Sequence, residues 1–146
     1  MSGSSGGGRF GGELDGFRIG HVPAGVGDLV SDFATESDDV RFTSRMWERE
    51  TAEGARVDLR VHVLRGERLA TLDDLRDFLA EYHERAPAGW GLTEFRPGGL
   101  PGLAGETEAF WLVTPGVGVD VLIDPAVGGQ PELVAVANAV TPAGAD

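Results

Sequence analysis

An uninterrupted alternation of apolar and polar side chains between residues 57 and 63 is the feature that most constrains the fold. The order is Val57, Asp58, Leu59, Arg60, Val61, His62, Val63. Successive side chains of a β-strand point to opposite faces of its sheet. The segment is therefore predicted to be a strand with one buried face and one solvated face.

Similar patterns predict the other elements. We expect strands at 17–22, 40–50, 92–96, 107–113 and 117–124, with a hairpin loop at 51–55, a loop or turn region at 24–39 and a flexible Gly/Pro loop at 97–105. A helix is expected over 71–86, with Thr71 as its N-cap and Asp74 completing a capping box. A second helix is expected from Pro131 to Val140, before Pro142.

This order of elements predicts the α+β class. We expect a two-layer sandwich, in which two helices pack on one face of a mainly antiparallel sheet. The single domain is expected to span 17–141. Residues 1–16 are rich in Gly and Ser and are predicted to be a disordered linker, and 142–146 a frayed tail.

Composition excludes several functions. The net charge is −12, from 24 acidic and 12 basic residues, and every basic residue is Arg. Such a chain lacks the basic surface that nucleic acid or anionic lipid attracts, and it has no Cys for disulfides or thiolate metal sites. We expect no membrane insertion and, because residues 1–16 contain no signal peptide, a cytoplasmic location, or an extracytoplasmic one if an anchor lies upstream.

Local motifs predict no catalytic, cofactor-binding or metal-binding residue. The Gly-rich segments lack the strand–helix context of a dinucleotide fingerprint, and no Ser lies in a nucleophile elbow. Metal-binding pairs on a helix need partners three or four residues apart, and those positions around His83 hold Leu79, Ala80, Ala86 and Pro87. We therefore expect no cofactor and no metal.

The first hairpin offers a candidate binding surface. If Phe42, Ser44 and Met46 lie opposite Val63, Val61 and Leu59, the Arg side chains of both strands point outward together. The candidate binding residues are Arg41, Arg45, Trp47, Arg49, Arg60 and His62. Such a platform suits a small anionic ligand or an acidic protein surface, although exposed strands also carry Arg without any function.

Two segments resemble known domains. The stretch Phe17–Gly25, an apolar strand followed by Pro-x-Gly, is similar to the start of PsbP-like domains, including the LpqN-type domains of actinobacterial lipoproteins. The strand at 108–113 and the helix at 132–140 resemble those of small extracytoplasmic domains of Gram-positive bacteria. The resemblance implies a non-catalytic accessory domain.

We therefore expect a non-enzymatic interaction or ligand-binding accessory domain from a GC-rich, actinobacterial source. The alternative is a small enzyme with a site between sheet and helices, using His62 or His83 and dispersed carboxylates. A third interpretation is a domain that self-associates through an exposed strand edge.

Overall fold

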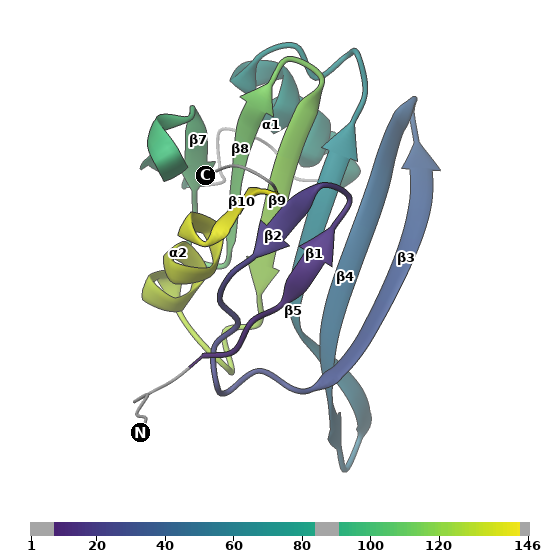
Figure 1. The fold of residues 1–146 in the computed structure, drawn as a ribbon, viewed down its shortest axis with the longest axis vertical. Coiled ribbons are helices and arrows are strands. Elements are labelled where there is room, and N and C mark those ends of the chain that lie inside the picture. The colour runs from purple at the N-terminus through teal and green to yellow at the C-terminus, as the bar shows by residue number, and fades with distance from the viewer. Residues whose placement is uncertain (1–7, 84–90, 144–146) are drawn as a thin grey trace.

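The fold contains ten strands, two α-helices and one 3₁₀ turn in the described residues, 8–83 and 91–143, of a computed structural model (Figure 1). The elements are β1 (Gly12–Leu14), β2 (Phe17–Ile19), β3 (Leu29–Ser37), β4 (Val40–Thr51), β5 (Gly54–Arg65), α1 (Leu72–Tyr82), β6 (Thr93–Phe95), the 3₁₀ turn η2 (Pro97–Gly99), β7 (Gly102–Ala104), β8 (Glu108–Thr114), β9 (Val117–Ile123), α2 (Gln130–Asn138) and β10 (Val140–Pro142). The α+β class is confirmed.

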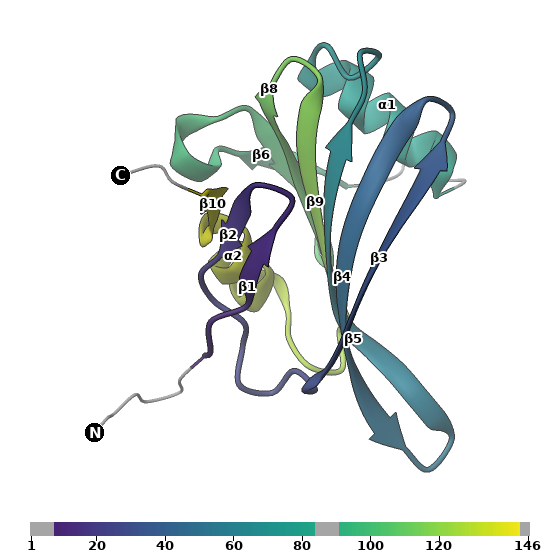
Figure 2. The ribbon, with the colours of Figure 1, turned by 45° about the vertical axis from the view of Figure 1, so that its right-hand side comes forward.

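The strands form two antiparallel sheets. The large sheet has the order β3-β4-β5-β9-β8-β7-β6, and the small one the order β1-β2-β10. In the large sheet, β5 and β9 are central, whereas β3 and β6 are its edges. The long hairpin of β4 and β5 extends beyond the rest of the molecule at its tip (Figure 2).

The two helices cover opposite faces of the large sheet, so the prediction that both lie on one face was wrong. On one face, Val63 and Trp111 pack with α2 and the small sheet; on the other, Leu64 and Phe110 pack with α1. Figure 2 shows the resulting layers, with α1 on one side of the sheet and α2 with the small sheet on the other. The cause is that central strands bury both their odd and their even side chains, as the apolar run 109–113 does.

Helix α1 begins at the predicted capping box. The N–H of Asp74 donates to Thr71 Oγ1 at 3.1 Å, and the Asp74 carboxylate accepts from the N–H of Thr71 at 3.2 Å. The helix buries Leu75, Phe78 and Leu79 against the sheet. At Gly118 of β9 an added Cβ would lie 3.0 Å from the Leu75 side chain, so the missing side chain lets α1 approach the sheet closely.

Several segments expected to be irregular are ordered. Residues 8–16 of the predicted linker contain β1, and Leu14 is buried; residues 1–7 lie outside the described part. The expected loop at 24–39 contains β3, and the loop at 97–105 contains a 3₁₀ turn and β7. The expected tail begins in β10, where the N–H of Ala143 donates to Gly16 O at 2.8 Å. Partner strands, which local composition does not reveal, order these segments.

Neither described helix has the length and hydrophobicity needed to cross a lipid bilayer.

Replacing Thr71 with Ala is expected to lower the free energy of unfolding by about 1 kcal/mol, because it leaves helix N–H groups without their side-chain acceptor. Thr71→Ser keeps the hydroxyl and should lose much less. Urea unfolding followed by circular dichroism measures both changes; equal losses in the two variants would show that the hydroxyl does not stabilise α1.

Candidate functional site

Ionisable side chains gather beneath the C-terminal end of α1, on the face of the large sheet that this helix covers. His83 follows the last turn of the helix, and its N–H donates to Leu79 O at 2.9 Å. Glu108 is the first residue of β8, and Asp120 lies in the middle of the neighbouring β9. We call these three residues the His–carboxylate cluster.

The cluster is compact and almost closed to solvent. His83 Nε2 lies 3.0 Å from Glu108 Oε2 and 3.9 Å from Asp120 Oδ2. The side chains of Glu108 and Asp120 are 3% and 1% exposed, whereas that of His83 is 19% exposed. His83 is therefore the member of the cluster that solvent reaches most easily.

Burial and nearby charges raise the pKa values of two members of the cluster, Asp120 and His83. The pKa of Asp120 is raised well above its usual value, first by burial and then by the adjacent charge of Glu108. Interaction with Asp120 and Glu108 raises the pKa of His83 to about 9, against the opposing effect of burial. Two buried carboxylates thus hold positive charge, or protons, at this point of the fold.

A neutral pair lies beside the cluster. Ser44 of β4 and His62 of β5 are both buried, and Ser44 Oγ is 2.6 Å from His62 Nδ1. His62 is also the cross-strand neighbour of Asp120. Burial lowers the pKa of His62 to about 4, assisted by the positive charge of Arg60.

This chemistry suits binding of a cation better than nucleophilic catalysis. A Ser–His–Asp triad needs an ionised carboxylate that orients the His and a His basic enough to accept the Ser proton. Here the pKa of Asp120 is raised and that of His62 is lowered, so both shifts oppose that role. A nitrogen and two carboxylates turned toward one another are instead a ligand set for a metal ion.

The residues proposed for the Arg/Trp platform do not share a face, because the predicted register was wrong for most of the hairpin. Near the tip, Glu48 lies opposite Val57, as the prediction requires. The register shifts between Trp47 and Glu48, where Asp58 is the additional residue of a β-bulge, so that Phe42 lies opposite Leu64. A shift of one residue exchanges the two faces of a strand.

The bulge places Arg45 and Trp47 on the α2 side of the sheet, and Arg60 and His62 on the α1 side. Trp47 is buried in the core and cannot form part of an exposed platform. His62 was expected on a solvated face and is buried, next to the His–carboxylate cluster.

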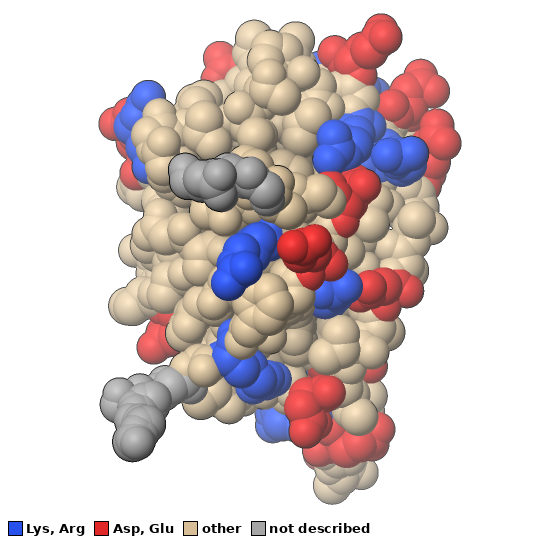
Figure 3. Space-filling view, in the orientation of Figure 1, with Lys and Arg blue, Asp and Glu red and all other residues tan. Residues whose placement is uncertain are grey.

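Two of the four platform Arg side chains have acidic partners among the described residues. Arg45 forms two hydrogen bonds with Asp32, at 2.7 and 2.8 Å, and Arg49 Nε lies 3.1 Å from the buried Asp58. Figure 3 shows positive and negative side chains interleaved on the visible face rather than a single cationic patch. Binding by individual members of the platform stays a prediction.

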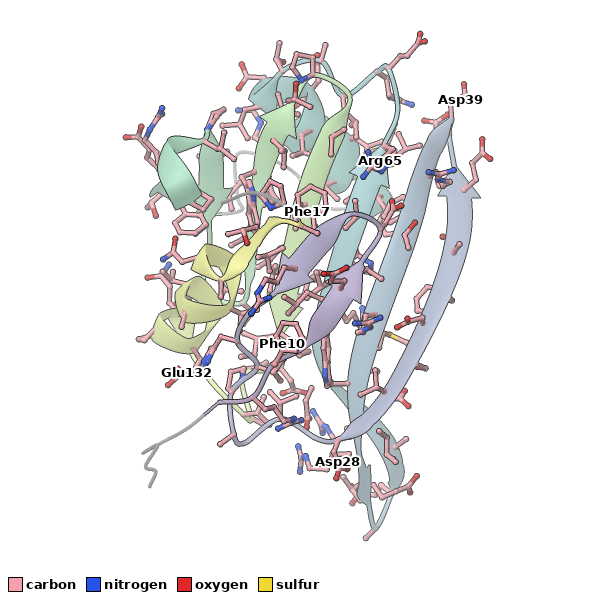
Figure 4. The ribbon with its side chains drawn as sticks, viewed as in Figure 1. Phe10, Phe17, Asp28, Asp39, Arg65 and Glu132 are labelled. Carbon is pink, nitrogen blue, oxygen red and sulfur yellow. The ribbon has the colours of Figure 1, made fainter. Side chains whose placement is uncertain are left out.

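Arg41 is the platform residue whose surroundings suit binding of a small anion. It lies opposite Arg65 in the β4–β5 pairing, and both line a shallow surface hollow of about 550 Å³ with Gly66, Glu67 and Pro115. Arg65, labelled in Figure 4, is already paired with Asp15 at 2.8 Å. A small anionic ligand would therefore meet one unpaired guanidinium here among the described residues.

The sequence contained a weak signal for the cluster. Asp120 interrupts an apolar strand, and Glu108 directly precedes the apolar run 109–113. A charged residue among residues that are buried on both faces of a strand is itself buried. The search around His83 considered only neighbours on its own helix and so missed partners on the sheet.

Comparisons with protein-family models, curated proteins and solved structures found no match to this chain. The resemblance to PsbP-like domains therefore stays a prediction.

Stability should fall with acidification partly through His62. Its folded-state pKa of about 4 is below the unfolded value near 6.5, so its neutral form stabilises the fold above pH 6.5 and this contribution is lost as the pH falls towards 4. The contribution is at most about 3 kcal/mol. Urea unfolding between pH 7 and 4 should show a shallower pH dependence for His62→Gln than for the native chain, and equal pH dependences would contradict this assignment.

Proposed function

We propose that the chain is a non-enzymatic accessory domain that binds an extended segment of a partner protein along the free edge of β3. The supporting observation is the exposure of β3 (Leu29–Ser37) on both faces over eight of its nine residues, all except Ser37. Membership of the PsbP-like domains of actinobacteria is part of the same proposal.

The edge of β3 has the properties of a strand that accepts another strand. It pairs with β4 in unbroken register from Leu29 to Ser37 and ends the described large sheet. Leu29, Val30 and Phe33 are large apolar side chains between 39% and 53% exposed. Its sequence contains no Pro and no Lys, two residues that commonly protect edge strands. Main-chain hydrogen bonds along such an edge give affinity, and side-chain contacts give specificity.

The negative charges along β3 indicate which kind of partner segment this edge would bind. Acidic residues lie along β3 and at its two ends: Asp28, Asp32, Glu36, Asp38 and Asp39. Figure 3 shows acidic side chains along the edge where Figure 1 places β3, and Figure 4 labels Asp28 and Asp39 at the ends of the strand. Only Asp32 and Asp38 form ion pairs with described residues, Arg45 and Arg68.

These acids favour a segment that alternates apolar and basic residues. They disfavour a second copy, because two strands of the same negative sequence would repel each other. The earlier proposal of an acidic partner depended on an Arg platform whose members do not share one face; a small anion at Arg41 remains compatible with the geometry.

The enzymatic alternative has one observation in its favour, the assembly of His83 with two carboxylates between α1 and the sheet. Burial of both carboxylates leaves little room for a substrate to contact them. The four hollows given by described residues, of about 200 to 550 Å³, are lined by residues outside the cluster. A binding domain therefore fits the geometry better.

Selection from a phage-displayed library of random nine-residue peptides tests this function. Peptides with alternating apolar and basic residues should be enriched on the immobilised chain. In hydrogen-exchange NMR, they should protect β3 amides, because a new strand would accept hydrogen bonds from the free edge. Val30→Lys should weaken binding about tenfold, since it removes apolar contact and adds a repelling charge.

Phe10→Lys is the matched control, since Phe10 and Val30 are similarly exposed, at 56% and 53%. Selected peptides that bind the Val30→Lys variant as tightly as the native chain would contradict the proposal. Light scattering of the chain at increasing concentration tests whether a second copy of the chain binds the β3 edge instead of a peptide. A dimer that Val30→Lys abolishes would identify a second copy as the occupant.

A further inference from the structure

The feature that the proposed function does not use is the His–carboxylate cluster, on the other side of β4 and β5 from the edge strand. Glu108 and Asp120 lie on adjacent strands, and both side chains are almost completely buried. Two buried negative charges side by side are costly unless a cation or a proton compensates them. The cluster therefore needs positive charge at a defined position.

The described residues leave the Asp120 carboxylate without full compensation of its charge and without hydrogen bonds. Both carboxylate oxygens are buried, and neither has a hydrogen-bond partner in the described part of the chain. Its nearest cationic group is His83 Nε2, at 3.9 Å, which is an ion-pair distance and too long for a hydrogen bond. Buried polar atoms are nearly always hydrogen-bonded, so two unpartnered oxygens on one side chain indicate a further ligand.

The geometry matches the spacing of metal ligands. One ligand atom from each of His83, Glu108 and Asp120 lies within 4.8 Å of the others, and His83 Nε2 lies 3.0 Å from Glu108 Oε2. Ligands that are each about 2 Å from a metal ion lie about 3 to 3.5 Å apart. The 3.0 Å separation matches this spacing, and the 3.9 Å separation of His83 Nε2 from Asp120 Oδ2 is slightly longer than it.

The donor atoms identify the class of ion. One imidazole nitrogen and two carboxylate oxygens suit divalent first-row transition metals, whereas Ca²⁺ and Mg²⁺ prefer ligands that are all oxygen. His83 also follows the C-terminal end of α1, where the helix dipole favours a positive charge. His83 is the most exposed member of the cluster, with 19% of its side chain accessible to solvent.

We propose that His83, Glu108 and Asp120 bind one divalent transition-metal ion between α1 and the sheet, with Zn²⁺ and Mn²⁺ as the best-suited ions. His83 binds through Nε2 and each acid through one carboxylate oxygen. His62 is the cross-strand neighbour of Asp120 and is bonded to Ser44 through Nδ1, and it is not among the proposed ligands. The sequence predicted no metal site, and this proposal departs from that expectation.

Calorimetric titration of the chelator-treated full chain with ZnCl₂, MnCl₂ or MgCl₂ tests the site. Zn²⁺ or Mn²⁺ should bind with a stoichiometry of one and a Kd in the micromolar range or below, at least about tenfold tighter than Mg²⁺. Asp120→Asn and Glu108→Gln retain side-chain shape and should each weaken binding by about tenfold or more. Glu94→Gln and His21→Gln, outside the cluster, should leave the affinity unchanged.

A second measurement uses the native chain and needs no variant. In ¹⁵N NMR of the native chain, Zn²⁺ should shift the His83 ring nitrogens and leave those of His21 in place, because only His83 would bind the ion. Absence of binding below about 1 mM for both Zn²⁺ and Mn²⁺ would overturn the proposal. A shift of the His21 ring instead of the His83 ring would also overturn it.

Discussion

Burial of both faces of the central strands is the constraint on which the structure depends. Side chains of β5, β9 and β8 that point one way pack with α2 and the small sheet, and those that point the other way pack with α1. Any polar side chain in the middle of these strands must then find partners inside the protein. Ser44 and His62 satisfy each other in this way, whereas Asp120 has a close cation and no hydrogen-bond partner among the described residues.

Burial of the large sheet differs between its central strands and its edge strand β3. The middle strands are covered by a layer on each side, but β3 is exposed on both faces along all of its length except its last residue. The two candidate sites follow from this difference. A closed interior favours selective retention of a small ion, and an open strand favours recognition of another chain.

Sequence patterns located most of the regular elements, because strand alternation and helix capping are local. The hairpin at 40–65 and the Thr71 capping box are at their predicted places. The fold class could also be predicted, but not the placement of the helices, since alternation at 57–63 suggests a solvated face that α1 in fact covers. The Asp58 bulge, which reverses the face of Arg45 relative to Arg60, has no local sequence signal. The cluster depends on contacts between residues far apart in the sequence, so a search around His83 could not find it.

The small sheet has a mechanical consequence. Strands β1 and β10 both pair with β2, through three residue pairs on each side, and they run parallel to each other. Tension applied between the two ends of the described chain would pull β1 and β10 in opposite directions along β2. The force would load these short ladders in shear. The small sheet would therefore resist such tension through hydrogen bonds that are strained along the strands and not opened one after another.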